Sequence, residues 1–529
     1  MLAAIIATFG SLAVANAAAA PSDPNRLCSH IKTPCLSHAR VLSVSSAELR
    51  NHTVAAFPPI LNEPVGGVNV CEVNVTLTHP GANDTVTVQV WLPLDGWNGR
   101  FLSAGGSAWA AGHGPLTLAS YAVQGFAAAS TDAGLLGNLA DPSPWALRPN
   151  GQVNTELLTN FASRSIHDMA VVGKAATTSY YGQAPNFSYW QGCSTGGRQG
   201  MVAAQQYPGD FDGILAASPA IYWTKYVIAE LWPQVVMKEQ GYYPSVCELA
   251  AVREDAVAAC DQLDGVQDGV ISNPAKCKYD PSRLIGKTLD CGNGTKTTAG
   301  SALVSVVRKI WEGPKTAAGS PLWYGLPIGA PLDTLAATQV VNGTRLGAPF
   351  FVAQDWARYF VKANPQFDVL GLDSNGLRQL FAESVQEFAS VIDSSNPNLS
   401  GVQKSGGKLL VWHGGADNVI FPQATVQYYE EAGRRLGGGG RLDDFFRLFI
   451  APGVDHCAAG SIDGAGPTNA LGSLIDWVEK GKVPQYLAAA TGPKAKKQFT
   501  RKLCPYPSVA KYDGHGDPND SMSYQCGKL

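Results

Sequence analysis

The sequence predicts a protein of the α/β class, in which a mostly parallel sheet with flanking helices is interrupted by a large inserted domain. Two observations support this prediction. Short apolar and β-branched segments alternate with segments of helical periodicity near both ends of the chain, and such an alternation places neighbouring strands parallel to one another. Between residues 222 and 400 the strand rhythm stops and Cys, Gly and Pro become frequent, which indicates the insertion.

The composition narrows the class of protein further. A chain of 529 residues has room for about two to four domains, or for one domain with a large insertion. A formal net charge of −3 without a basic run argues against binding to nucleic acid or to an acidic membrane surface. A hydrophobic fraction of 45% can build a full core, and 57 Gly with 34 Pro predict many turns and loops.

The N-terminus has the pattern of a secretory signal peptide. Residues 1–17 are apolar and end in Ala15, Asn16 and Ala17, as at a cleavage site, although no Lys or Arg precedes the apolar stretch. No later apolar stretch reaches the roughly 18 residues that span a bilayer. We therefore expect a secreted, extracellular protein without a membrane anchor. Acceptors for N-glycosylation are expected at Asn51, Asn74, Asn83, Asn186, Asn293, Asn342, Asn398 and Asn519.

Residues 18–221 and 401–529 are expected to form the domain built on the sheet, with residues 222–400 as the inserted domain. Strands are expected where β-branched or apolar residues lie between Pro, Asp and Gly turns, and helices where apolar residues recur at helical spacing. The expected strands are Thr85–Leu92, Arg100–Ser103, Gly125–Ser130, Asn186–Gln191, Lys408–Trp412 and Phe446–Ile450, and the expected helices are Ile166–Tyr180, Gly197–Tyr207 and Leu471–Val483.

A candidate nucleophile, Ser194, lies in the pentapeptide GCSTG of residues 192–196, which matches the pattern G-x-S-x-G. The pentapeptide follows one expected strand and precedes an expected helix. This context is typical of a nucleophile elbow, a tight turn from strand to helix that exposes the serine Oγ above the sheet. Without the context, a glycine-rich turn with an incidental serine would be an equally good interpretation.

A serine nucleophile needs a general base and an acid that orients the base. In the α/β-hydrolase arrangement the chain order is Ser, then Asp or Glu, then His, with the last two on loops after later strands. Downstream of Ser194 the histidines are His413, His456 and His515, and His456 follows an expected strand in a turn-rich loop. We therefore predict Ser194 as the nucleophile, Asp417 as the orienting acid and His456 as the general base.

Two alternatives stay open at this point. His413 could be the base, although it ends an expected strand, and Asp455 could be the acid, although a residue adjacent to the histidine would rarely reach its Nδ1. A further feature concerns Cys193 and Cys457, which flank the proposed nucleophile and base. If Ser194 and His456 lie within hydrogen-bonding reach, these two cysteines are close enough for a disulfide.

Taken together, Cys193-Ser194, Asp417 and His456-Cys457 resemble the Cys-Ser, Asp, His-Cys arrangement of the tannase and feruloyl esterase family. The resemblance covers most of the mature chain, including the glycine loop at 105–106, the stretch GCSTGGRQG from residue 192, the aspartate-rich loop near 261, and segments at 356–360 and 476–479. It implies a secreted protein with an α/β-hydrolase core and a large inserted lid domain, which hydrolyses esters of phenolic acids.

The resemblance also implies details of the site. It implies a disulfide between Cys193 and Cys457, and an oxyanion hole in which the N–H of Thr195 is assisted by that of Gly105 or Gly106, with Ser107 as a third candidate. Family members are richer in glycine in this loop than the present chain, so the second donor is open.

The aspartate-rich loop, residues 260–270 (CDQLDGVQDGV), is a candidate metal site. Its three carboxylates within eight residues suit Ca²⁺, although the spacing is not that of an EF-hand and a solvated acidic turn is an equal alternative from the residues alone. The resemblance favours structural Ca²⁺, with no organic cofactor. The ligands it implies are the side chains of Asp261, Asp264 and Asp268 and the carbonyls of Val266 and Val270.

Eleven cysteines without a Cys-x-x-Cys pair indicate a disulfide framework rather than a zinc finger. An odd number leaves one thiol free or paired between chains, and Cys35, Cys247 and Cys291 are unassigned. Besides the pair at the proposed site, the expected bridges are Cys260–Cys277, Cys504–Cys526 and Cys28–Cys71.

Three functions are compatible with these features. The first is a feruloyl esterase that releases hydroxycinnamic acids from plant cell-wall polysaccharide, and the second is a tannase that cleaves galloyl esters. The third is a non-catalytic, calcium-dependent protein that binds cell-wall material. The complete Ser, Asp and His set favours an enzyme, with a phenolic-acid ester as its partner and no nucleic acid or membrane. The oligomeric state is not predicted.

Overall fold

The computed structural model describes residues 27–528 except 293, 438–441 and 459–462. The expected signal peptide at 1–17 and the glycosylation acceptor Asn293 therefore lie outside the described residues. Six of the other expected acceptors are exposed, and Asn74 is partly buried on a strand. No helix within the described ranges is long and apolar enough to cross a membrane.

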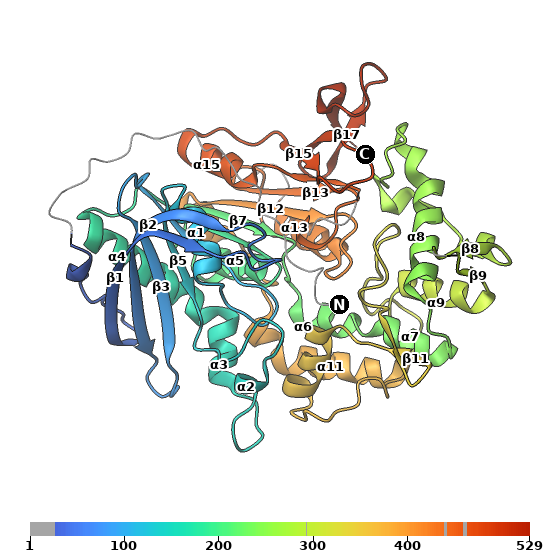
Figure 1. Ribbon diagram of the computed structural model, residues 1–529, viewed down its shortest axis with the longest axis horizontal. Helices are drawn as coiled ribbons and strands as arrows, with labels where there is room; N and C mark the ends of the chain where they lie inside the picture. Colours follow the sequence, from blue (N-terminus) through green and yellow to red (C-terminus); the bar gives the residue numbers. More distant parts are fainter. Residues whose placement is uncertain (1–26, 293, 438–441, 459–462, 529) are drawn as a thin grey trace.

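A nine-stranded mixed sheet forms the centre of the molecule (Figure 1), with the strand order β1-β2-β3-β5-β4-β6-β7-β12-β13. The strands from β5 to β13 in this order are parallel, whereas β1, β2 and β3 form an antiparallel edge that joins β5. Their bounds are β1 Arg40–Val54, β2 Val65–Thr78, β3 Val86–Pro93, β4 Arg100–Ala104, β5 Ala127–Thr131, β6 Phe187–Cys193, β7 Gly213–Ala217, β12 Lys408–Gly414 and β13 Phe446–Ala451. The predicted α/β class is confirmed.

Helices cover both faces of this sheet. Alternate residues of a strand point to opposite faces, so Val411 of β12 joins one hydrophobic cluster while its neighbours Leu410 and Trp412 join another. The first cluster includes residues of α4, α5 and α13, and the second includes residues of α1 and α15. The helix bounds are α1 Pro115–Ala122, α2 Ser143–Ala146, α3 Thr155–Thr159, α4 Ser165–Tyr181, α5 Thr195–Gln206, α13 Pro422–Arg435 and α15 Ala470–Lys480.

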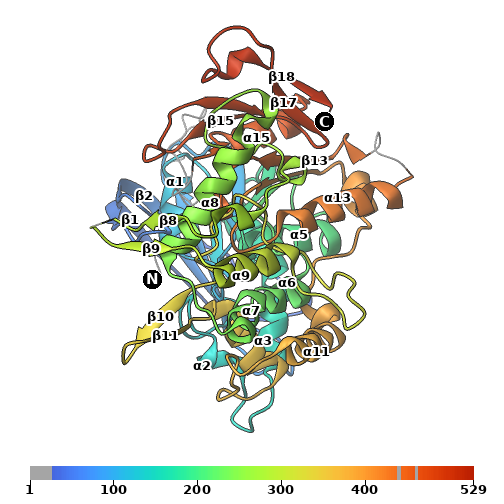
Figure 2. The same ribbon diagram turned by 90° about the vertical axis from the view of Figure 1, so that its right-hand side faces the viewer.

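The segment between β7 and β12 is inserted between two neighbouring parallel strands and lies to one side of the sheet (Figures 1 and 2). It is mainly helical, with two short hairpins. Its elements are α6 Trp223–Ala229, α7 Trp232–Gln240, α8 Val246–Cys260, β8 Thr288–Asp290, β9 Lys296–Thr298, α9 Ser301–Glu312, β10 Thr338–Val341, β11 Thr344–Gly347, α10 Phe351–Asp355, α11 Ser374–Ile392 and α12 Ser400–Ser405.

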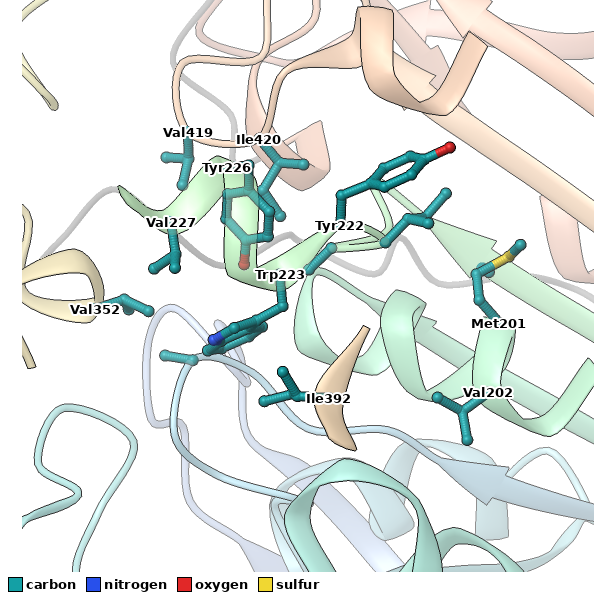
Figure 3. Packing of buried hydrophobic residues seen from close by; sticks show 14 of the residues in the cluster. Met201, Val202, Tyr222, Trp223, Tyr226, Val227, Val352, Ile392, Val419 and Ile420 are labelled. Atoms are coloured by element: carbon teal, nitrogen blue, oxygen red, sulfur yellow. The ribbon is translucent and has the colours of Figure 1, made fainter. Parts of the chain in front are cut away.

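The inserted segment shares its core with the sheet domain. Figure 3 shows side chains of α6, α10 and α11 packed together with Val202 of α5 and with Val419 and Ile420 of the loop after β12. This continuous packing holds the inserted helices against the loop that carries Asp417. After β13 the chain forms two small sheets, from β14 Ala465–Pro467, β15 Leu487–Thr491 and β16 Thr500–Leu503, and from β17 Ser508–Tyr512 and β18 Tyr524–Lys528.

Five disulfides connect distant parts of the described chain. Four of them are the expected pairs, and the fifth joins Cys247 to Cys291, two of the cysteines that the sequence left unassigned. Cys35 is the free, exposed thiol. The expected pairs are Cys28–Cys71, Cys193–Cys457, Cys260–Cys277 and Cys504–Cys526.

Candidate active site

Ser194 occupies the turn between β6 and α5 with φ 62° and ψ −122°, a conformation that few residues other than glycine adopt. Such strain is typical of a nucleophile elbow. Neighbouring glycines are required because the backbone packs closely here. A Cβ on Gly192 would lie 2.5 Å from the carbonyl of Gly196, and one on Gly197 would lie 2.3 Å from the carbonyl oxygen of Ala217. The small residues of the motif therefore serve the turn itself.

The expected acid and base lie side by side on loops after β12 and β13. His456 Nδ1 is 2.8 Å from Asp417 Oδ2, and the two side chains are 1% and 0% exposed. The other oxygen, Asp417 Oδ1, accepts the backbone N–H groups of Val419 and Ile420 at 2.9 and 2.8 Å. These bonds fix the carboxylate so that Oδ2 is presented to the imidazole.

Asp417 is held in its charged form. Burial alone would raise the pKa of the carboxyl, but the bonds and charges of His456 and His413 outweigh burial and keep the pKa of Asp417 well below its usual range. His413 Nε2 lies 3.0 Å from Asp417 Oδ2, within hydrogen-bonding distance, and His413 Nδ1 lies 2.8 Å from Thr425 Oγ1. His413 is therefore a buried support of the acid, and the geometry does not favour its alternative role as the base.

The disulfide between Cys193 and Cys457 joins the nucleophile turn to the base loop, with 6.0 Å between the two Cα atoms. It ties the residue before Ser194 to the residue after His456. Since Nδ1 of His456 bonds Asp417, Nε2 is the nitrogen left to act on the serine. This buried Nε2 has no hydrogen-bond partner among the described residues, as is common before substrate closes a site.

The expected glycine donors of the oxyanion hole are not confirmed, because their N–H groups are engaged elsewhere. The N–H of Gly105 donates to the Gln191 carbonyl at 2.9 Å, and that of Gly106 donates to Gln199 Oε1 at 3.0 Å. Ser107, the third candidate, donates its N–H to the Ala110 carbonyl at 3.1 Å. The residue whose N–H assists that of Thr195 therefore stays a prediction.

Gly105 instead lets the loop approach the elbow, and Gly106 lets the loop fold back on itself at Ala110. A Cβ on Gly105 would lie 2.6 Å from Gly196 Cα, and one on Gly106 would lie 2.0 Å from the Ala110 carbonyl oxygen. Thr195 remains the candidate donor, since it is the first residue of α5 and such first-turn N–H groups have no acceptor within their helix. Its side chain donates to the Ala108 carbonyl at 2.8 Å, which fixes the start of the helix.

A cavity of about 30 Å³ adjoins Ser194, and it contains a histidine that the sequence did not single out. His113 lines this cavity, and its Nε2 lies 2.8 Å from Ser107 Oγ. Burial lowers the pKa of His113 to about 4, so the ring is neutral near pH 7. It lies in the loop after β4, seven residues beyond Gly106, and no sequence pattern pointed to it.

Glu230, at the end of α6, is a second carboxyl near the acid that the sequence did not reveal. It is buried, and neither of its oxygens has a hydrogen-bond partner within the described part of the chain. Burial, together with the charge of Asp417, raises the pKa of Glu230 well above its usual range. The charged form of Glu230 is therefore disfavoured by its surroundings.

The aspartate-rich loop is ordered by its own hydrogen bonds. Asp261 accepts the N–H groups of residues 268–270, Asp264 accepts from Ser272 Oγ, and Asp268 Oδ2 bonds Arg501 at 2.6 Å. Three carboxylates against one guanidinium leave a net negative charge, and all the donor atoms are hard oxygens, which fits Ca²⁺. The ligand atoms of the three carboxylates do not all lie within 4.8 Å of one another, so in this conformation these described residues are not yet arranged around one point.

Comparison with known proteins gives consistent results. A family model described as "Tannase and feruloyl esterase" matches residues 71–527. A probable feruloyl esterase of Arthroderma benhamiae is 47% identical over 507 residues, which covers 95% of this chain and 94% of the relative. A probable feruloyl esterase B of Emericella nidulans is 31% identical over 504 residues, covering 90% and 89%.

Solved structures agree with these sequence matches. The tannin acyl hydrolase of Aspergillus niger has a TM-score of 0.84 at 26% identity, covering 95% of this chain and 94% of that one. Feruloyl esterase B of Aspergillus oryzae has a TM-score of 0.76 at 28% identity, covering 93% and 97%. The predicted α/β-hydrolase core is confirmed.

Proposed function

This chain belongs to the tannase and feruloyl esterase family, and from that membership we propose that it hydrolyses esters of ferulic and related hydroxycinnamic acids on plant cell-wall polysaccharide. The family makes it a carboxylic ester hydrolase, so the non-catalytic binding protein is no longer a candidate. One observation carries the proposed mechanism: the strained turn at Ser194 is tied by a disulfide to the loop on which His456 bonds Asp417.

In the proposed mechanism His456 Nε2 takes the proton of Ser194 as Oγ attacks the ester carbonyl carbon. Asp417 keeps the other ring proton on Nδ1 and stabilises the imidazolium that forms. The N–H of Thr195, at the positive end of α5, stabilises the negative oxygen of the tetrahedral intermediate. His456 then gives the proton to the leaving alcohol, and water attacks the acyl-enzyme by the reverse steps and releases the phenolic acid.

Methyl ferulate is expected to be hydrolysed faster than methyl gallate. The reason is that the relative with 47% identity is named a probable feruloyl esterase, whereas the tannin acyl hydrolase is only 26% identical. The measurement is kcat/KM of the purified protein for both esters under the same conditions. Methyl p-coumarate serves as a matched substrate that lacks the methoxy group of ferulate.

A higher kcat/KM for the gallate would move the assignment to a tannase, which the TM-score of 0.84 to a tannin acyl hydrolase makes the second candidate. Hydrolysis of neither ester above the level of a Ser194→Ala variant would contradict a phenolic substrate altogether. Release of ferulic acid from feruloylated arabinoxylan would test the attachment to polysaccharide.

Secretion is part of the proposal. It is supported by the apolar leader with its small-residue cleavage pattern, by five disulfides, and by exposed Asn-x-Ser/Thr acceptors such as Asn83 and Asn398. Disulfides persist in oxidising compartments, and glycosylation takes place on the secretory route.

Bound Ca²⁺ is the remaining part of the proposal, with Asp261, Asp264 and Asp268 and the carbonyls of Val266 and Val270 as ligands. The ion would neutralise the excess carboxylates and brace a loop that Cys260–Cys277 already closes. Since the loop bonds Arg501 of the C-terminal part, we propose a structural role.

Removal of calcium by EGTA is expected to lower the Tm by about 3 °C, because a ligand bound only to the folded state stabilises it by about 3 kcal/mol at a hundredfold excess over Kd. Differential scanning calorimetry with EGTA or with excess Ca²⁺ measures this shift. Asp264→Asn should abolish the response, while Asp290→Asn, at another carboxylate of the inserted segment, should preserve it. An equal Tm with EGTA and with Ca²⁺ would contradict calcium binding.

A further inference from the structure

A second cluster of imidazoles and carboxylates lies at the opposite edge of the sheet from β12 and β13. His38 comes just before β1, His79 directly follows β2, and Asp168 lies in the first turn of α4. Asp168 and His79 are buried, whereas the side chain of His38 is 34% exposed. The ligand atoms of these three residues all lie within 4.8 Å of one another. Among the described residues, this is the one group of three or more His, Cys, Asp or Glu side chains that lie so close together.

The contacts within the cluster leave one nitrogen–oxygen pair of His79 that needs a proton or a metal ion between its two atoms. His79 Nδ1 lies 2.6 Å from Asp84 Oδ2, and its Nε2 lies 3.1 Å from Asp168 Oδ2. A neutral imidazole has one N–H, so it can donate to one of these carboxylates while its other nitrogen presents a lone pair to the second. A lone pair facing an anionic oxygen is repelled unless a proton or a metal ion lies between them.

Asp84 is placed to fix which nitrogen of His79 carries the proton. It is buried and accepts from the backbone N–H of His79 at 2.8 Å and from Asn160 Nδ2 at 2.7 Å, in addition to its contact with Nδ1. A carboxylate held in this way accepts the Nδ1 proton, and in the neutral ring the Nε2 lone pair then faces Asp168. Histidines that bind metals typically donate their far nitrogen to a fixed carboxylate of this kind.

The surrounding charge also favours a cation. Asp84 and Asp168 are both buried carboxylates. Arg164 forms a long ion pair with Asp84, with 3.7 Å between its guanidinium and Asp84 Oδ2. His38 Nε2 lies 2.6 Å from Asp168 Oδ1, so both Nε2 atoms converge on the same carboxylate. The ring of His38 is partly exposed to solvent, whereas the carboxylate of Asp168 is buried.

We propose that His38, His79 and Asp168 bind a divalent transition-metal ion of the zinc class, through both Nε2 atoms and a carboxylate oxygen, with water as a further ligand. Two imidazoles and one carboxylate are a donor set that zinc and its transition-metal neighbours take, whereas Ca²⁺ and Mg²⁺ take oxygen ligands. The ligand atoms are already close enough that small rotations of the side chains would place them about 2 Å from one ion.

The ion has a structural role, because the cluster is remote from the nucleophile in the sheet. Strands β3, β5 and β4 separate β2 from β6, which carries the elbow. Metal ligation would join the segment before β1, the end of β2 and helix α4, which are distant in sequence. Cys28–Cys71 already ties the same N-terminal segment to β2, so the metal and the disulfide would together secure the antiparallel edge.

The test is zinc binding by the purified full chain after treatment with dipicolinate and dialysis into metal-free buffer. Zinc is added in the presence of a chromophoric chelator, and the bound metal is measured by competition and by mass spectrometry after desalting. One zinc ion per chain is expected, with a rise in Tm. His38→Gln should weaken zinc binding by about a hundredfold or more, and the matched variant His30→Gln, at an exposed histidine of the same segment, should leave it unchanged.

Because Asp168→Asn removes a buried charge and could impair folding, the partly exposed His38 is the variant on which the test depends. Asp264→Asn in the aspartate-rich loop should retain zinc, which separates this site from the proposed calcium site. The proposal is overturned if the wild-type chain binds no zinc in excess of His38→Gln, or if His30→Gln lowers binding as much as His38→Gln does. In either case a proton, rather than a metal ion, balances the cluster.

Discussion

Ser194→Ala is expected to lower kcat/KM for the preferred phenolic ester by about 10⁴-fold or more, with little change in folding. The substitution removes the only atom that attacks the carbonyl and leaves the rest of the site in place. Ser194 makes its backbone bonds, to the Ala217 carbonyl and from the Arg198 N–H, without its side chain. The turn therefore does not depend on the hydroxyl.

The effect is measured by initial rates on the ester and by the Tm of the same preparation. Ser301→Ala is the matched control, since it removes an exposed serine hydroxyl at the start of α9. A loss of activity accompanied by a fall in Tm of more than a few degrees would indicate a structural defect. A Ser194→Ala variant that retained a tenth of the activity would rule out Ser194 as the nucleophile.

The parts of the site that the sequence could predict depend on local backbone requirements. The G-x-S-x-G pattern is readable because the elbow itself demands small residues, as the close approach of Gly192 to Gly196 shows. Asp417 and His456 follow from chain order and from loops after apolar strands. The Cys193–Cys457 pairing was accessible because a disulfide fixes a distance between two neighbours of catalytic residues.

The oxyanion donors could not be predicted in the same way. Whether the N–H of Gly105 is available depends on its pairing with the Gln191 carbonyl, and that of Gly106 depends on a side chain 93 positions away, Gln199. Both are tertiary contacts with no local sequence signature. Glu230 and the His38, His79 and Asp168 cluster were missed for the same reason, since each acquires its environment from segments remote in the chain.

Two of the strands that the sequence analysis missed, β1 and β7, lack the usual composition of strands. β1, with the sequence RVLSVSSAELRNHTV, is an edge strand with mostly exposed or half-buried residues, so the apolar alternation is weak. β7, with the sequence GILAA, is short and rich in Ala, which has a low preference for strands. It forms a strand because β6 and β12 pair with it on both sides and bury it completely.

Asp417→Asn is the second change for which we expect a large effect, a fall in kcat of about 10⁴-fold. Asp417 Oδ1 accepts two backbone N–H groups, while Oδ2 lies within hydrogen-bonding distance of His456 Nδ1 and His413 Nε2. An asparagine would keep its single oxygen with the backbone donors and turn its NH₂ group toward the imidazoles.

The NH₂ group would donate to Nδ1 of His456 and so place the ring proton on Nε2. That tautomer cannot accept the serine proton, because its Nε2 lone pair is gone. The geometry of the loop should be kept, so KM should change much less than kcat. Steady-state kinetics on the preferred ester measure both constants for the variant and the wild type.

The Tm of the wild type and of Asp417→Asn gives a second, independent test of the charge on Asp417, and its dependence on pH can be predicted. Since the folded pKa of Asp417 lies below its unfolded value of about 3.9, the carboxylate stabilises the fold above that pH. This contribution is lost as the pH falls through the folded pKa. The Tm difference between the wild type and Asp417→Asn should therefore be larger at pH 6 than at pH 3.

Asp455→Asn is the matched control, because Asp455 is the buried neighbour of the base and was the alternative acid. It should reduce kcat far less than Asp417→Asn does, since the Asp417–His456 bond remains intact. If instead Asp455→Asn had the larger effect on kcat and Asp417→Asn retained more than a tenth of the activity, the roles of the two carboxylates would be exchanged. The 2.8 Å contact between Asp417 Oδ2 and His456 Nδ1 would then be structural, and the base would be oriented from its own loop.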